Sequence, residues 1–153
     1  MATIYGYLGA TETRGGAPPS HHVMIATPVG VSPCTDYVRS LAATVEMLSR
    51  CNIRLDLHML QGHCHVDDSR NIIIRDFLTT QCTDLFFIDA DMGWKAQNFL
   101  RLLRVPGDVA AGVYTHKSDA FTFPFHPPPG VELRPNEHGL YEMPKVATGF
   151  MRL

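Results

Sequence analysis

An uninterrupted apolar run that ends in two carboxylates constrains this chain more than any other feature. Residues 85–88 are Leu-Phe-Phe-Ile, Asp89 follows them directly, and Asp91 comes two positions later. A short continuous apolar run is typical of a strand buried on both faces of a parallel sheet, so it predicts the central strand of an α/β protein. Ligands of such sheets bind beyond the carboxyl ends of the strands, and we therefore expect Asp89 and Asp91 at a ligand-binding edge.

Two carboxylates at such an edge suit a hard divalent cation. Mg²⁺ and Mn²⁺ bind one or two carboxylates and take their other ligands from water and substrate phosphate. The motif therefore predicts Mn²⁺ or Mg²⁺ at Asp89 and Asp91, with Asp91 as the first choice for the direct ligand. Turn residues that cap the next helix are the alternative, and the motif alone fits both.

Alternating hydrophobic patterns predict the other elements. Strands are expected over residues 22–26, 53–60 and 109–114, and shorter strands over 140–143 and 146–153. A first helix is expected to be capped at Ser32-Pro33, to end at Arg50 and to bury Val38, Leu41, Val45 and Leu48. A second is expected to be capped by Asp67 or Asp68 and to carry Ile73, Ile74, Phe77 and Leu78, and a third to span about residues 95–103. This alternation favours a mostly parallel sheet flanked by helices.

Four motifs occur in a characteristic order: MIATP at 24–28, SRN at 69–71 with Phe77-Leu78 following, FIDADMGW at 87–94 and GVYTHK at 112–117. A weaker echo, TGF, follows at 148–150. Together they resemble glycosyltransferases of the GT-A type, and more narrowly the family-2-like enzymes of viruses, phages and bacteria. The resemblance covers roughly residues 23–117.

The resemblance implies a fold and an activity. The fold is the Rossmann-like GT-A fold of nucleotide-diphospho-sugar transferases, and the expectation for the acceptor half is either a truncated product or a minimal domain. The activity is metal-dependent transfer of a sugar from a nucleotide-diphosphate sugar to a hydroxyl of a glycan, protein or lipid acceptor. Asp89 would orient the ribose or a metal-bound water as well as contribute to the metal site.

The resemblance also implies a set of nucleotide contacts, from Thr27, Pro28, Arg70, Asp89 and Lys117. An ordinary turn is the alternative for Thr27 and Pro28. The planar fork of Arg70 suits base edges or phosphate oxygens. The alternative is that Arg70 forms an ion pair or cap cluster with its acidic neighbours. Lys117 would neutralise the charge of the diphosphate, and the alternative is that it is an ordinary solvated surface lysine.

A general base is not identified. An inverting transferase needs a carboxylate or histidine to accept the proton of the acceptor hydroxyl. The acidic residues after Asp119 are Glu132, Glu137 and Glu142, and none stands in a recognisable motif. The catalytic residues stay unassigned, and a truncated or degenerate nucleotide-binding or interaction module without turnover is the alternative function. A metal-dependent nucleotidyltransferase or phosphohydrolase would need further carboxylates or a Gly-rich phosphate loop, which the sequence lacks.

Length and composition agree with one domain. The chain has 153 residues, 45% hydrophobic and 18% charged, which suffices for a single core. A net charge of −2 argues against nucleic acid as a partner, and no apolar segment is long enough to span a bilayer. Residues 1–20 lack the pattern of a signal peptide and are expected to form a flexible leader before a GT-A-like nucleotide-sugar-binding domain at 21–153.

The cysteines show no C-x-x-C spacing; they are Cys34, Cys51, Cys64 and Cys82. Without a secretion signal this predicts reduced thiols in a cytoplasmic protein. His63-Cys64-His65, with His58 nearby, raises zinc as an alternative. Adjacent residues of an extended segment point to opposite faces, and no second ligand pair follows at zinc-finger spacing, so the sequence disfavours it.

Residues 121–130 combine phenylalanines with prolines that a sheet ladder excludes. We expect a mobile flap that orders over the donor site when metal and nucleotide-sugar bind. The alternative is a loop already packed on the core. Trp94, the only tryptophan, either stacks on a sugar or base or packs on the core.

Overall fold

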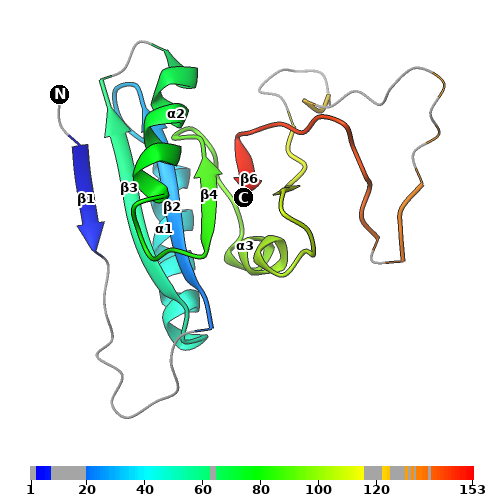
Figure 1. Ribbon diagram of the computed structural model, residues 1–153, viewed down its shortest axis with the longest axis horizontal. Coiled ribbons are helices and arrows are strands. Elements are labelled where there is room, and N and C mark those ends of the chain that lie inside the picture. Colours follow the sequence, from blue (N-terminus) through cyan, green and yellow to red (C-terminus); the bar gives the residue numbers. More distant parts are fainter. Residues whose placement is uncertain are drawn as a thin grey trace.

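The computed structural model describes residues 3–7, 20–62, 65–115, 122–124, 130, 132, 134–137 and 139–153. Strands and helices follow one another along the chain (Figure 1): β1 (Thr3–Tyr7), β2 (His22–Val29), α1 (Thr35–Arg50), β3 (Arg54–Gln61), α2 (Val66–Phe77), β4 (Asp84–Ile88), α3 (Ala96–Leu103), β5 (Ala110–Ala111) and β6 (Phe150–Arg152). The helices in the described residues are too short or too polar to cross a membrane.

The strands form one mixed sheet in the order β1-β3-β2-β4-β6-β5. Parallel pairing is confined to the central block, in which β2 lies between β3 and β4. The flanking pairs are antiparallel. The expected α/β class is confirmed, but a mostly parallel sheet was wrong, because β6 returns between β4 and β5 in the opposite direction.

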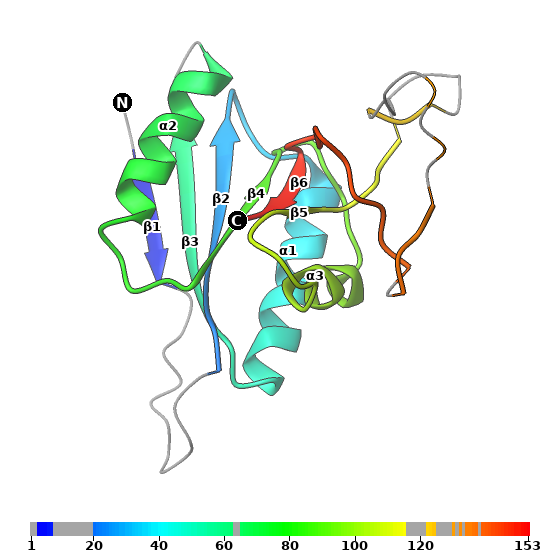
Figure 2. The ribbon, with the colours of Figure 1, turned by 45° about the vertical axis from the view of Figure 1, so that its right-hand side comes forward.

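Helices cover both faces of the sheet (Figures 1 and 2): α2 lies on one face, and α1 and α3 lie on the other. Because side chains alternate along a strand, each central strand contributes to both cores. Ile25 and Phe86 face the α1 and α3 side, where Phe86 stacks on Phe99 with 4.0 Å between ring centroids. Met24 and Phe87 face α2. The run at 85–88 is therefore buried on both faces, as predicted.

Helix α1 differs from its prediction in its start and its buried face. The N-cap is Cys34, whose sulfur accepts a hydrogen bond from the Tyr37 N–H at 3.3 Å, and not Ser32. The buried residues are Tyr37, Ser40, Thr44 and Leu48, whereas Val38 is 54% exposed. Of the residues predicted to be buried, Leu48 lies in the core and Leu41 and Val45 pack against it, so only Val38 was wrong. Ser40 and Thr44 are buried as well because they find partners: Trp94 donates its backbone N–H to Ser40 and its indole N–H to Thr44, each at 2.9 Å.

Helix α2 begins at Val66, with His65 as an N-cap that makes no side-chain cap bond. Asp67 and Asp68 occupy the first turn, where a negative charge favours the helix dipole, and are not the cap. Leu78, expected on the buried face, lies just past the last turn and is 74% exposed. The predicted β3 is confirmed, and its second face is buried as well, with His58 fully covered.

The margins of the sheet depart most from expectation. Residues 3–7, placed in a flexible leader, form β1 and pair with the outer edge of β3. The strand expected at 109–114 is reduced to β5, and the two expected at 140–143 and 146–153 are reduced to β6. Arg152 holds β6 in place, because its guanidinium donates to the carbonyls of Val105 and Gly107 and lies 3.5 Å from Asp84.

Candidate functional site

Asp89 is the first residue beyond β4, at the carboxyl end of the parallel block. Its N–H donates to the Gly149 carbonyl at 3.0 Å, and its carbonyl accepts from the Met92 N–H at 3.1 Å. The next carbonyl, that of Ala90, accepts from the Cys34 N–H at 2.8 Å. The turn that carries the two carboxylates is thus fixed by α1 on one side and by the approach to β6 on the other.

Arg70 comes to this turn from the first part of α2. Its guanidinium donates to Asp89 Oδ1 at 2.9 Å, across 19 positions of sequence, and lies 5.9 Å from the centre of the Phe87 ring. The two charged side chains are 18% and 36% exposed, so this is a partly buried ion pair. Arg70 Nε is buried without a hydrogen-bond partner among the described residues. The cap cluster considered for Arg70 therefore gives way to a contact with Asp89.

Tyr114 and Gly149 lie beside the turn. The Gly149 N–H donates to the Tyr114 hydroxyl at 3.1 Å. Burial raises the pKa of Tyr114, and the charges of Asp89 and Asp91 raise it further, while the Gly149 N–H and Arg70 act in the opposite direction. Tyr114 is therefore neutral at physiological pH. A Cβ on Gly149 would lie 2.5 Å from the tyrosine oxygen and 2.9 Å from Asp89 Oδ2, so any other residue would have to displace these side chains.

Asp91 is exposed in the same turn. Its charge acts on Tyr114 together with that of Asp89, so the two carboxylates share one electrostatic environment. Asp89 offers Oδ2 for further contacts, because Arg70 engages Oδ1. A carboxylate oxygen from each residue, supplemented by water, is the donor set that Mg²⁺ or Mn²⁺ takes.

Other predicted contacts lie elsewhere. Thr27 is fully buried, and its hydroxyl shares a 2.5 Å hydrogen bond with Tyr37 in the core. Pro28 lies within β2, opposite Leu60 of β3. Trp94 packs on the core, with its ring 5.2 Å from that of Tyr37, which matches the packing alternative. Lys117 lies outside the described residues, as does most of the predicted flap at 121–130.

Sequence reasoning did not assign roles to Tyr114 and Gly149. Both nevertheless stand in motifs that carry the resemblance, GVYTHK and TGF. The signal was the distant echo at 148–150, since β6 brings that segment beside β4.

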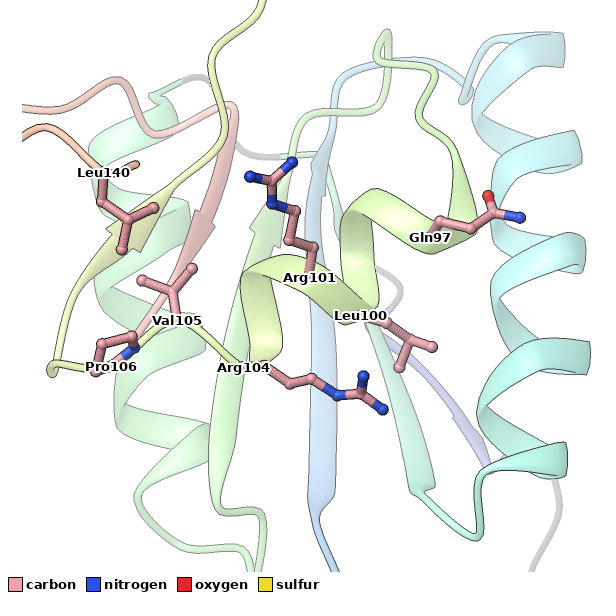
Figure 3. Close-up of a pocket in the computed structure, with 7 residues that line it drawn as sticks. All are labelled: Gln97, Leu100, Arg101, Arg104, Val105, Pro106 and Leu140. Atoms are coloured by element: carbon pink, nitrogen blue, oxygen red, sulfur yellow. The ribbon is translucent and has the colours of Figure 1, made fainter. Parts of the chain in front are cut away.

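A cavity of about 460 Å³ opens beside α3, away from the turn (Figure 3). It is lined by Gln97, Leu100, Arg101, Arg104, Val105, Pro106 and Leu140. Its walls carry two cations and no carboxylate, so it lacks ligands for a divalent metal. We place the candidate site at Asp89 and Asp91 on this chemistry.

Comparisons of the chain with protein families, with curated proteins and with solved structures gave no significant match.

Proposed function

We propose that the turn after β4 binds the diphosphate of a nucleotide-sugar together with Mn²⁺ or Mg²⁺, and that the chain transfers the sugar to an acceptor hydroxyl. The observation that carries this proposal is the Arg70–Asp89 ion pair at the carboxyl end of β4, beside the exposed Asp91. A cation-binding pair of carboxylates and an anion-binding guanidinium lie together, which a metal–diphosphate complex requires.

The residues of the turn would divide the work. Asp91 and the Oδ2 atom of Asp89 would hold the cation, and Arg70 orients Asp89 through its contact with Oδ1. When bound, the cation supplies Lewis-acid stabilisation of the departing diphosphate.

The rigid backbone supports the same assignment. The turn is bonded to both Cys34 and Gly149 before any ligand arrives, so little conformational entropy remains to be lost on binding. Binding beyond the carboxyl ends of parallel strands is also the usual position in open α/β sheets.

Binding without turnover is the second candidate. Tyr114 contacts the turn through Gly149 and has a raised pKa, so it donates a proton poorly and cannot act as a base near neutral pH. No other group in the described part of the chain is assigned as the base. A donor-binding module is therefore distinguished from a transferase by turnover alone.

Calorimetry with a panel of nucleoside diphosphates and their sugars, with and without Mn²⁺, tests the site. We expect binding that requires the metal and that weakens at least about tenfold in Asp91→Asn. Asp108→Asn, which neutralises an exposed carboxylate between α3 and β5, is the matched control and should bind as the parent does. Unchanged Mn²⁺-dependent affinity in a folded Asp91→Asn protein would remove the site from consideration.

Release of nucleoside diphosphate from the bound donor separates the two candidates. Release that depends on an added glycan, protein or lipid acceptor supports transfer. Tight metal-dependent binding without release, over a broad acceptor panel, supports the binding module.

A further inference from the structure

A second group of ligand-type side chains lies at the opposite end of the parallel block. His22 is the first residue of β2, Asp56 lies early in β3, and Cys82 precedes β4. His22 shares its strand face with Met24, which packs in the α2 core together with Cys82. Three separate segments of the chain therefore bring an imidazole, a carboxylate and a thiol to one point.

The donor atoms converge closely. His22 Nε2 lies 3.0 Å from Asp56 Oδ2, and Cys82 Sγ donates to the same oxygen at 3.5 Å. One donor atom from each residue lies within 4.8 Å of the others. Four ligands at Zn–N, Zn–O and Zn–S distances around a tetrahedral zinc stand about 3.3–3.8 Å apart, so small rotations of these side chains would admit the ion.

One of the converging atoms, and the second oxygen of the carboxylate, make no hydrogen bond in the described part of the chain. His22 Nε2 is buried and makes no hydrogen bond within the described residues, since its short approach to Asp56 lacks hydrogen-bond geometry. Asp56 Oδ1 is also buried without a hydrogen bond in this part of the chain. Buried polar atoms are normally paired, because an unpaired one costs the desolvation of the group. A cation at the point of convergence would provide a partner for His22 Nε2.

We propose that His22, Asp56 and Cys82 bind a zinc ion, with water as the fourth ligand. Nitrogen and sulfur donors select zinc over the hard cations expected at Asp89 and Asp91. The Asp56 side chain is 23% exposed, so solvent reaches the site. The ion ties the starts of β2 and β4 to β3 and has a structural role, independent of the proposed nucleotide site.

Metal binding must displace a proton. Burial is the main cause that raises the pKa of the Cys82 thiol, to about 11, and the neighbouring Asp56 contributes. Without metal, Cys82 is therefore a thiol that donates to Asp56. On binding, the S–H bond breaks, the sulfur lone pair forms the bond to Zn²⁺, and the proton passes to solvent. The positive charge of Arg54, whose Nε lies 4.0 Å from Asp56 Oδ1, repels the cation and lowers the affinity for zinc.

Cobalt substitution tests the proposal on the full chain. The reduced, chelator-treated protein is titrated with Co²⁺, and the near-ultraviolet thiolate-to-cobalt band is recorded before and after one equivalent of Zn²⁺. We expect a saturable band that Zn²⁺ abolishes. Cys82→Ser should lose the band, and Asp56→Asn should weaken Co²⁺ binding at least about tenfold.

Two cysteine variants are controls. Cys51→Ser, at the exposed end of α1, should keep the band. Cys64→Ser should keep it as well, and loss there would assign the metal to the 63–65 segment and overturn the proposal. A parent protein without a band would overturn it too. If Cys82→Ser fails to fold, alkylation of the parent decides: Zn²⁺ should protect Cys82 selectively, as read by peptide mass spectrometry, and equal labelling with and without Zn²⁺ contradicts the site.

Discussion

The guanidinium of Arg70 and the carboxylate of Asp89 meet at 2.9 Å, although one belongs to α2 and the other follows β4. The contact joins a helix on one face of the sheet to the carboxyl end of its central strand. The contact uses one nitrogen of the guanidinium and Oδ1 of the carboxylate. Oδ2 of Asp89 and Nε of Arg70 take no part in it. This arrangement suits the ligand-binding role that we propose for the turn.

Replacement of Arg70 should affect binding more than folding. Arg70→Ala is expected to lower nucleotide affinity by about 1.5–3 kcal/mol, the usual range for a hydrogen bond to a charged group. Arg70→Lys should restore only part of it, since an ammonium lacks the planar fork. Arg75→Ala, on the exposed side of the same helix, is the control and should leave calorimetric affinity unchanged. A lower melting temperature with unaltered affinity in Arg70→Ala would assign the residue to stability instead.

Gly149 should tolerate no side chain. In Gly149→Ala the new methyl would lie 2.5 Å from the Tyr114 oxygen, and overpacking of this kind typically costs about 1–3 kcal/mol. We expect a lower free energy of unfolding in urea and weaker nucleotide binding, because Asp89 must also shift. Gly30→Ala is the matched control, because no atom lies within 4 Å of the added carbon, and it should leave the free energy of unfolding nearly unchanged. Equal stability of the two variants would show that the turn is looser than described.

The hydroxyl pair in the core should be worth more than either hydroxyl alone. Thr27→Val leaves the buried Tyr37 hydroxyl without its partner and should cost about 1–3 kcal/mol in urea unfolding. The double variant Thr27→Val with Tyr37→Phe should recover much of that loss, because neither polar group then remains unpaired. Nucleotide affinity is expected to stay constant in both. A specific loss of affinity in Thr27→Val would instead support the nucleotide contact predicted from the sequence.

His58 should make the protein sensitive to mild acid. Burial lowers its pKa in the folded chain, and Asp76 only partly offsets this. As the pH falls below about 6.5, the unfolded chain takes up the proton first, so the free energy of unfolding falls until the folded pKa is passed. His58→Gln should flatten the stability profile below pH 6.5, measured by urea unfolding. His65→Gln, exposed at the start of α2, should retain the parent's slope, and an unchanged slope in His58→Gln would contradict the assignment.

The central elements could be predicted because their signals are local. The apolar run before Asp89 and the alternation along β3 are visible within a few residues, and both strands formed where expected. The apolar part of the buried face of α1 could be predicted, but the burial of Thr44 could not, since the partner that donates to its hydroxyl is Trp94, 50 positions away. Likewise, no spacing rule links His22, Asp56 and Cys82, which only the strand register brings together.

The bond from Asp89 to Gly149 also sets an order of events during synthesis. The parallel block can assemble as soon as β4 has emerged, but the partner of Asp89 appears only after α3, β5 and the long segment that follows. Closing that loop carries an entropic cost, and contacts of such sequence separation slow folding. The nascent chain can therefore pair four of its six strands before the turn after β4 is complete, and that turn is among the last parts of the fold to form.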